Sequence, residues 1–332
     1  MKNRHDGLAP TPARLGPSAA LVLASAALAA VGCKPDLGAP PSLVIGPQIL
    51  AIRGTPPEAA ESASVTYDVL AVDVSGTVPN PPIDWAQCLA PDPPANGNDV
   101  SSACLTIPDD AGPAPTFTAA LPDDACMLFG PETPPPQKGQ PPTRPADADT
   151  TGGYYQPIRA TWSVDSGQQL AFALERILCR LANAPVDAAG QYAADYLPNQ
   201  NPQLADLILD PAGAATPLFT AGQAAVTAGS VAAGQTVTLQ ADWSAGSAET
   251  FLVWDVVSLS LVLQQESLRL SWFATGGSFL HDASGRSSTE TETFTQNSWT
   301  APNVAGAVHF WMVLRDDRGG LDFAEAEIDV TP

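Results

Sequence analysis

The residues best suited to catalysis lie together near position 281. His281-Asp282 is followed, within a Gly- and Ser-rich stretch, by Ser284, Ser287 and Ser288. A Ser-His-Asp hydrolase needs its nucleophile on a strained elbow beside an oxyanion hole. No G-x-S-x-G pattern occurs near these residues. We therefore assign no catalytic residue and predict that the protein is not an enzyme.

Adjacent carboxylates are the second group with chemical potential. The pairs are Asp109-Asp110, Asp123-Asp124, Asp147/Asp149 and Asp316-Asp317. General acid–base catalysis needs two carboxylates in a shared cleft, and neighbours along a strand or turn tend to diverge. Calcium needs six or more oxygens around one point, and the chain has no EF-hand loop. We assign no metal and no cofactor, while calcium at Asp147/Asp149 or Asp316-Asp317 stays an open alternative.

Cysteines are the third group. Four of the five form an even set, Cys88, Cys104, Cys126 and Cys179, and Cys33 stands apart from them. The chain has no Cys-x-x-Cys pair and no nearby histidine, which argues against zinc. In an exported protein the even set predicts two disulfides. We expect Cys88–Cys104 with Cys126–Cys179, and the other two connectivities stay open.

The residues before Cys33 give that cysteine a separate role. A positively charged start is followed by an apolar run from about Ala19 to Val31, too short to span a bilayer but as long as a signal-peptide core. The segment Leu21–Cys33 resembles the signal peptide and lipobox of bacterial lipoproteins, with Ala30 where Leu is usual. The resemblance implies cleavage before Cys33, attachment to the membrane by lipid on Cys33, and an outer-membrane location because Lys34 follows.

The charge of the chain narrows the choice of partners. The chain holds 35 acidic and 14 basic residues, a formal net charge of −21. Residues 1–32 carry three Lys or Arg and one Asp, so their removal leaves −23. Such a surface repels phosphate backbones, and we exclude nucleic acid as a partner.

The first half of the mature chain opens with segments that predict half-buried strands: Gln48–Arg53, Ser64–Asp73 and Ile83–Leu89. Their order, with Trp85 on the third, resembles the start of an immunoglobulin-like sandwich. From Pro79 to Pro145 the pattern dissolves, because this window holds 17 of the 34 prolines. We expect long loops there, tied by the disulfides.

Two later segments of this half leave alternatives. Gln168–Ala182 fits either a helix or a strand; we favour a strand, which resembles the end of immunoglobulin strand F. Pro185–Tyr196 predicts a short helix. Tyr154, Tyr155 and Trp162 are clustered aromatics that form either a sugar- or peptide-stacking surface or the cover of a sheet face.

The second half has no cysteine and alternates in several places, including Gln235–Trp243, Ser267–Phe273 and Phe323–Val330. The alternation of Phe323–Val330 predicts a last strand at the edge of its sheet. Asp210–Gly234 predicts a low-complexity loop and Phe251–Leu263 an inserted hairpin. Ala307–Leu314 is apolar on both faces, as expected of a central strand. Trp272–Phe279 and Trp299–Pro302 are similar to bacterial PKD-like and immunoglobulin-like repeats, which implies fold and not activity.

These observations predict an all-β protein: a lipoprotein signal peptide (1–32), a lipidated Cys33 with a Pro/Gly-rich tether (33–46), and two immunoglobulin-like sandwich domains (47–198 and 199–332). We expect a membrane-anchored envelope lipoprotein that works as a non-enzymatic binding or structural module for a protein or polysaccharide. The alternatives are a surface hydrolase or lyase with an acid pair in the first domain, and an accessory subunit of a secretion or surface machine.

Overall fold

The computed structural model describes residues 39–90, 100–130, 138, 152–181, 184–210, 212–222 and 229–332. Pro41–Pro332 form one compact unit. The expected signal peptide, Cys33 and Asp147/Asp149 lie outside the described residues. Within the described part, no helix is long and apolar enough to cross a membrane.

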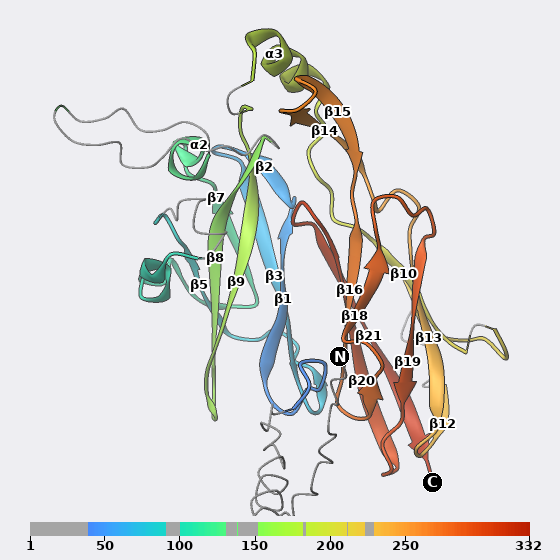
Figure 1. The fold of residues 1–332 in the computed structure, drawn as a ribbon. Coiled ribbons are helices and arrows are strands. Elements are labelled where there is room, and N and C mark those ends of the chain that lie inside the picture. Colours follow the sequence, from blue (N-terminus) through green and yellow to red (C-terminus); the bar gives the residue numbers. More distant parts are fainter. Residues whose placement is uncertain are drawn as a thin grey trace, which may run out of the picture. The chain divides into compact units, whose positions relative to one another are not determined.

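The fold is all-β, as predicted, and its first half is a two-sheet sandwich (Figure 1, blue to green). Its strands are β1 (Gln48–Thr55), β2 (Glu58–Ala60), β3 (Ser64–Asp73), β4 (Gly76–Thr77), β5 (Ile83–Gln87), β6 (Ala111–Ala114), β7 (Thr116–Ala120), β8 (Gly153–Val164) and β9 (Gly167–Leu178). One sheet has the order β1-β3-β4, with β7 also on β3, and the other has the order β2-β9-β8-β5-β6. The core between them includes the fully buried Tyr67 and Trp85.

The first strand of this sandwich changes sheets. β1 pairs antiparallel with β3, and β2 pairs parallel with β9. Pro56 and Pro57 separate the two pieces. Proline has no N–H to donate to a ladder, so the strand is interrupted there.

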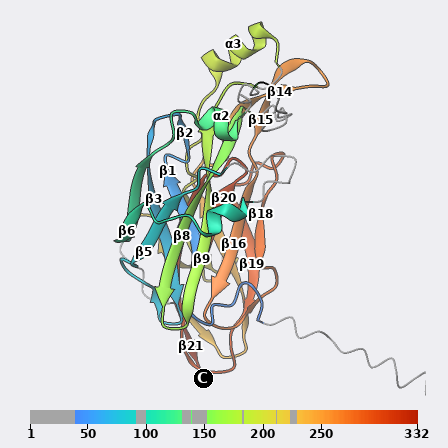
Figure 2. The ribbon, with the colours of Figure 1, turned by 90° about the vertical axis from the view of Figure 1, so that its left-hand side faces the viewer.

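The ambiguous segment 168–182 is a strand over most of its length. β9 pairs with β8 along its entire length, in a long hairpin that Figure 2 shows. The comparison with strand F was wrong, because β9 lies between β2 and β8 and is the last strand of the sandwich. The helix expected next is α3 (Val186–Asp195).

Both disulfides have the expected pairing. Cys88, just after β5, is joined to Cys104 in the short 3-10 helix η2 (Ser102–Leu105). Cys126 in helix α2 (Ala125–Phe129) is joined to Cys179, just after β9. Each bridge therefore fastens an irregular segment to a strand of the same sheet.

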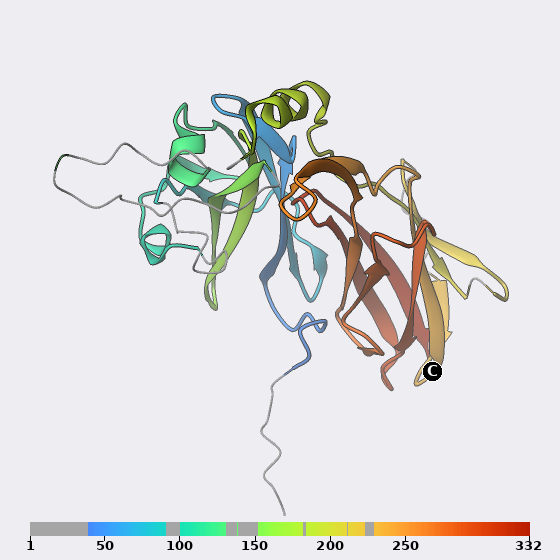
Figure 3. The same cartoon turned by 45° about the horizontal axis from the view of Figure 1, so that its top comes forward.

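The second half is another sandwich (Figure 3, yellow to red). Its strands are β10 (Leu204–Leu209), β11 (Thr216–Thr220), β12 (Gly229–Ala232), β13 (Thr236–Trp243), β14 (Thr250–Asp255), β15 (Ser260–Gln265), β16 (Leu268–Ala274), β17 (Ser278–Phe279), β18 (Ala283–Arg286), β19 (Phe294–Thr300), β20 (Gly306–Asp316) and β21 (Leu321–Thr331). Its sheets have the orders β11-β10-β13-β19-β17 and β12-β21-β20-β16-β18.

The second sandwich repeats the strand plan of the first. β12 pairs parallel with the last strand, β21, as β2 does with β9. Trp272 on β16 is buried like Trp85 on β5. Two expectations need correction: the segment 210–234 contains strands β11 and β12, and β21 is not an edge strand because β12 covers part of its outer side.

Strand β20 is buried on both faces because the two sandwiches pack together. Phe310 and Met312 point into the second sandwich's own core. Trp311 and Val313, on the other face, belong to a cluster with Leu70 of the first sandwich. Trp311 also donates from Nε1 to the hydroxyl of Thr77, at 2.8 Å.

The segment expected to be a tether is shorter than predicted. Val44 is fully buried in the cluster between the sandwiches. Its N–H donates to the carbonyl of Ala274 on β16, and the Ser42 hydroxyl donates to Asp282 at 2.6 Å. The chain thus contacts the second sandwich before it enters β1 of the first.

The inserted hairpin β14–β15 is present as predicted and contacts α3 (Figure 1). Tyr192 and Tyr196, in and just after α3, are stacked at 4.6 Å between ring centroids. They share a buried cluster with Phe251, Val253 and Trp254 of β14.

Candidate functional site

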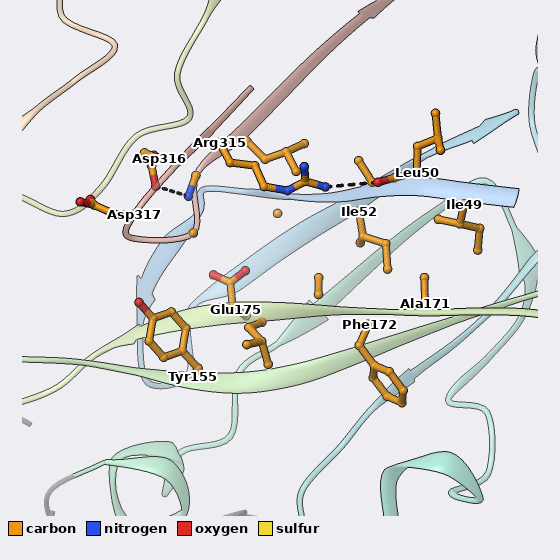
Figure 4. Close-up of a pocket in the computed structure, with 17 residues that line it drawn as sticks. Ile49, Leu50, Ile52, Tyr155, Ala171, Phe172, Glu175, Arg315, Asp316 and Asp317 are labelled. Atoms are coloured by element: carbon orange, nitrogen blue, oxygen red, sulfur yellow. Dashed lines mark hydrogen bonds between the residues drawn. The ribbon is translucent and has the colours of Figure 1, made fainter. Parts of the chain in front are cut away.

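A cavity of about 410 Å³ lies where three elements of the compact unit meet (Figure 4). The lining residues come from β1 (Ile49–Ile52 and Gly54), from β9 (Ala171–Glu175) with Tyr155 of β8, and from the β20–β21 turn with the adjoining strand ends (Arg315–Asp317 and Gly319–Leu321). Its volume falls in the usual range of small-ligand sites.

The sheet topology explains the opening. β1 is the edge strand of its sheet, and β9 has a partner on only one side until it reaches Arg176. These two open edges lie beside each other, and the β20–β21 turn lies against them. A Cβ built on Gly319 of that turn would lie 3.6 Å from the Leu174 carbonyl.

Arg315 contributes the cation of the cavity. Its guanidinium donates to the Leu50 carbonyl at 3.2 Å, the bond drawn in Figure 4. No carboxylate among the described residues pairs with it. Burial, together with the nearby Arg269, lowers the pKa of Arg315. Within the described part of the chain, the cavity therefore presents a half-buried guanidinium that no carboxylate pairs with.

Glu175 contributes a buried carboxyl group. It is 3% exposed, lies opposite Gln156 in the β8–β9 ladder, and its Oε1 has no hydrogen-bond partner among the described residues. Burial, and next the charge of Glu58, raises the pKa of Glu175 to about 8. The group is therefore mostly protonated at neutral pH and can donate a hydrogen bond.

Behind the cavity, a buried charge cluster joins the two sandwiches through Glu58 on β2. Its carboxylate accepts from Arg176 at 3.0 Å, from the Tyr196 hydroxyl at 2.8 Å and from the Asn199 N–H at 2.7 Å. Arg318, in the β20–β21 turn, lies 3.6 Å from the same carboxylate. These donors satisfy the oxygens of a carboxylate that would otherwise be costly to bury.

Arg318 is the centre of this cluster on the second sandwich. It donates to Glu266 and to Glu249, the latter at 2.8 Å, and its guanidinium lies 4.4 Å from the centre of the Phe251 ring. Burial, and next the charge of Asp316, raises the pKa of Glu266 to about 7, although Arg318 acts in the opposite direction.

The acid pair of the first sandwich is unsuited to paired-carboxylate catalysis. Glu58 and Glu175 influence each other electrostatically. The Glu58 side chain is fully buried and already accepts from three donors, so it cannot reach a substrate. The pairs Asp109-Asp110 and Asp316-Asp317 make structural contacts: Asp109 pairs with Arg159, and Asp316 accepts the Gly320 N–H at 2.7 Å.

The expected aromatic ligand surface does not form. Strand alternation in β8 turns Tyr154 and Trp162 into the sandwich core, where they are buried. Tyr155 faces the other side, accepts from Arg176 at 3.0 Å and lines the cavity. Of the three aromatics only Tyr155 belongs to the site.

The remaining candidates do not converge. The His281 backbone N–H donates to Asn297, and His309 Nδ1 lies 3.4 Å from Glu327. Asp317 accepts from Ser267. In the part of the chain that the structure describes, no group of three His, Cys, Asp or Glu could hold a metal ion.

The sequence reading missed Arg315, Glu175 and the Glu58–Arg318 cluster. One signal was present: Glu175-Arg176 interrupts an otherwise apolar run in β9, and charged residues inside such a run are costly to bury unless they are paired. The partner of Arg176 is Glu58, 118 positions away in the sequence, and Glu58 in turn lies near Arg318.

Comparisons with known proteins give little guidance. No family model matches the chain, and no curated protein matches it. Three solved structures are similar at low identity. The Yersinia pseudotuberculosis adhesin InvE has 9% identity and a TM-score of 0.23, over 84% of this chain and 58% of that one, so this chain spans little more than half of it.

The other two are an S-layer protein SbsC fragment (domains 4 and 5) and BspA_C_mut. The first has 9% identity and a TM-score of 0.20, over 86% of this chain and 100% of that one. The second has 7% identity and a TM-score of 0.23, over 87% and 82%. All three TM-scores are below 0.5, and we base no conclusion on them.

Proposed function

We propose that the protein is a non-enzymatic binding module of the bacterial cell envelope, anchored in the outer membrane by lipid on Cys33, whose two sandwich domains hold a ligand site at their junction. The observation that carries the proposal is the cavity between β1, β9 and the β20–β21 turn, with Arg315 and Glu175 in its wall.

The chemistry of the wall favours a polysaccharide over a protein as the ligand. Arg315 and protonated Glu175 both donate hydrogen bonds, so the ligand must offer acceptor oxygens. A sugar unit offers several such oxygens on a compact ring, and the cavity volume admits a unit of this size. The long-range negative charge of the chain favours a neutral saccharide over an acidic one.

The junction supports a rigid module. Apolar side chains such as Trp311 and Leu70 bury the contact between the sandwiches, and the Glu58–Arg318 cluster adds charged hydrogen bonds. Domains joined by small polar interfaces move relative to one another, whereas a dry apolar contact with buried ion pairs resists such motion. The walls of the cavity are therefore held in place before ligand binds.

The test is a titration of the chain Lys34–Pro332 with a panel of neutral and acidic oligosaccharides, by calorimetry. We expect a neutral oligosaccharide to bind, and Arg315→Leu to weaken its affinity at least about tenfold, the worth of one charged hydrogen bond. Arg180→Leu is the matched control, since Arg180 is an exposed arginine that does not line the cavity. If both variants bind the oligosaccharide equally well, the proposed site is wrong. If the protein binds a protein ligand and none of the oligosaccharides, the proposed saccharide ligand is wrong.

The anchor is tested separately. Replacing Cys33 with Ser should move the protein from the membrane fraction to the soluble fraction of cells, because several acyl chains supply the attachment. Retention of Cys33→Ser in the membrane fraction refutes the lipid anchor and leaves the ligand site untouched.

A further inference from the structure

The tip of the β14–β15 hairpin displays an unusual set of aliphatic side chains. Val256, Val257 and Leu259 are 60%, 88% and 70% exposed. They lie beyond the last ladder pair of the hairpin, Asp255–Ser260. Isolated exposed aliphatics are common, but three within four residues gather apolar surface at one turn.

The turn is built to hold these side chains outward. The Asp255 carboxylate accepts the N–H of Val257 at 2.9 Å and the N–H of Ser258 at 3.3 Å. Leu259 has a φ of 52°, in the left-handed region that bulky residues avoid. Glycine or asparagine would relieve the strain at this position, so the leucine there favours a role for the aliphatic side chain itself.

Several polar groups of the tip have partners within the tip. Besides the two N–H groups that Asp255 accepts, the hydroxyls of Ser258 and Ser260 bond each other at 2.8 Å. Protein interfaces use hydrogen bonds across the contact and anchor on Trp, Tyr and Arg, none of which occurs in residues 255–260. A turn whose large exposed side chains are aliphatic, and several of whose polar groups are paired locally, is suited to the interfacial region of a bilayer, where the remaining polar groups still meet water and headgroups.

Charge decides what kind of bilayer the tip can enter. Helix α3 and strands β14 and β15, with the turn between them, contain no Lys or Arg, and they contain Asp187, Asp195 and Asp255. Anionic headgroups would repel this end of the unit, whereas zwitterionic headgroups carry an ammonium that tolerates Asp255. We infer that the β14–β15 tip inserts Val256, Val257 and Leu259 into the interfacial region of a zwitterionic lipid bilayer.

The inference is independent of the ligand cavity and of Cys33, and it is tested without either. The chain Lys34–Pro332, which contains the whole compact unit and lacks the expected leader, is labelled with an environment-sensitive nitrobenzoxadiazole probe through Val257→Cys. It is then titrated with phosphatidylcholine vesicles and with phosphatidylglycerol vesicles. The probe at position 257 should shift to the blue and brighten with phosphatidylcholine, and much less with phosphatidylglycerol.

Two variants assign the effect to the tip. The unlabelled double variant Val257→Asp/Leu259→Asp should lose at least about tenfold in vesicle partitioning, because each change removes apolar burial and adds a charge. Leu263→Asp is the matched control, an equally exposed leucine (71%) on the same hairpin that pairs with Leu252, away from the tip; it should partition like the parent.

Three results would overturn the inference. They are no response of the probe to phosphatidylcholine, stronger binding to phosphatidylglycerol, and equal losses in the tip and Leu263 variants. Near-ultraviolet circular dichroism of each variant, which reports packed aromatics such as Trp254, separates a loss of insertion from a loss of folding.

Discussion

Glu175→Gln should make the protein more stable in mildly alkaline solution. The carboxyl has a pKa of about 8 in the folded protein and an ordinary value of 4.5 when unfolded. A raised folded-state pKa contributes stability that is complete below pH 4.5 and is lost as the pH rises through 8. At pH 8 the loss amounts to about 4 kcal/mol, at 1.36 kcal/mol per pKa unit. Glutamine has nearly the same shape and cannot ionise.

The assay is urea unfolding of the chain Lys34–Pro332, disulfides intact, followed by tryptophan fluorescence between pH 5 and 8. The free energies of unfolding of Glu175→Gln and the parent should agree within about 1 kcal/mol at pH 5 and diverge by several kcal/mol at pH 8. Glu266 titrates in both proteins and cancels in the difference. Glu292→Gln, at an exposed position, should follow the parent. If the free energies of unfolding of Glu175→Gln and the parent change in parallel with pH, Glu175 does not have the raised pKa.

Other changes probe the junction and the bridges. Arg318→Met should lower the free energy of unfolding by about 3–5 kcal/mol, because it leaves Glu58 and Glu266 without this cation. The loss should be larger at pH 8 than at pH 5, because removal of the guanidinium further raises the pKa of Glu266. A loss in urea unfolding that does not depend on pH would contradict this. Trp311→Ala should lower the free energy of unfolding by about 3–5 kcal/mol and speed proteolysis between the sandwiches. An unchanged midpoint of urea unfolding would exclude a packed junction. Removal of the Cys126–Cys179 disulfide should lower the free energy of unfolding by about 1 kcal/mol more than removal of Cys88–Cys104, because the first closes a loop of 53 residues and the second a loop of 16. The reverse order in thermal unfolding would rule out loop closure as the main effect.

Strands with one buried face were readable from the sequence. Ser64–Asp73 has the predicted bounds, and Gln235–Trp243 differs from β13 by one residue. In each, residues two apart share a face, and one face packs in the core of its own sandwich. Alternation reports such local burial directly.

Features that depend on the junction were not readable. Ala307–Leu314 is apolar on both faces, as predicted, but the reason lies in the contact of Trp311 and Val313 with the first sandwich. The cavity needs Arg315 and Glu175 to meet across 140 positions of sequence. Sequence patterns along one strand carry no information on which distant strand will cover its second face.

The parallel pairing of β2 with β9 has a mechanical consequence. When the first sandwich is pulled from its two ends, β2 and β9 are drawn along each other in opposite directions. The hydrogen bonds between parallel strands connect the two strands sideways, so the load is shared by all of them at once instead of opening them one after another. A tensile force on the first sandwich is therefore met in shear.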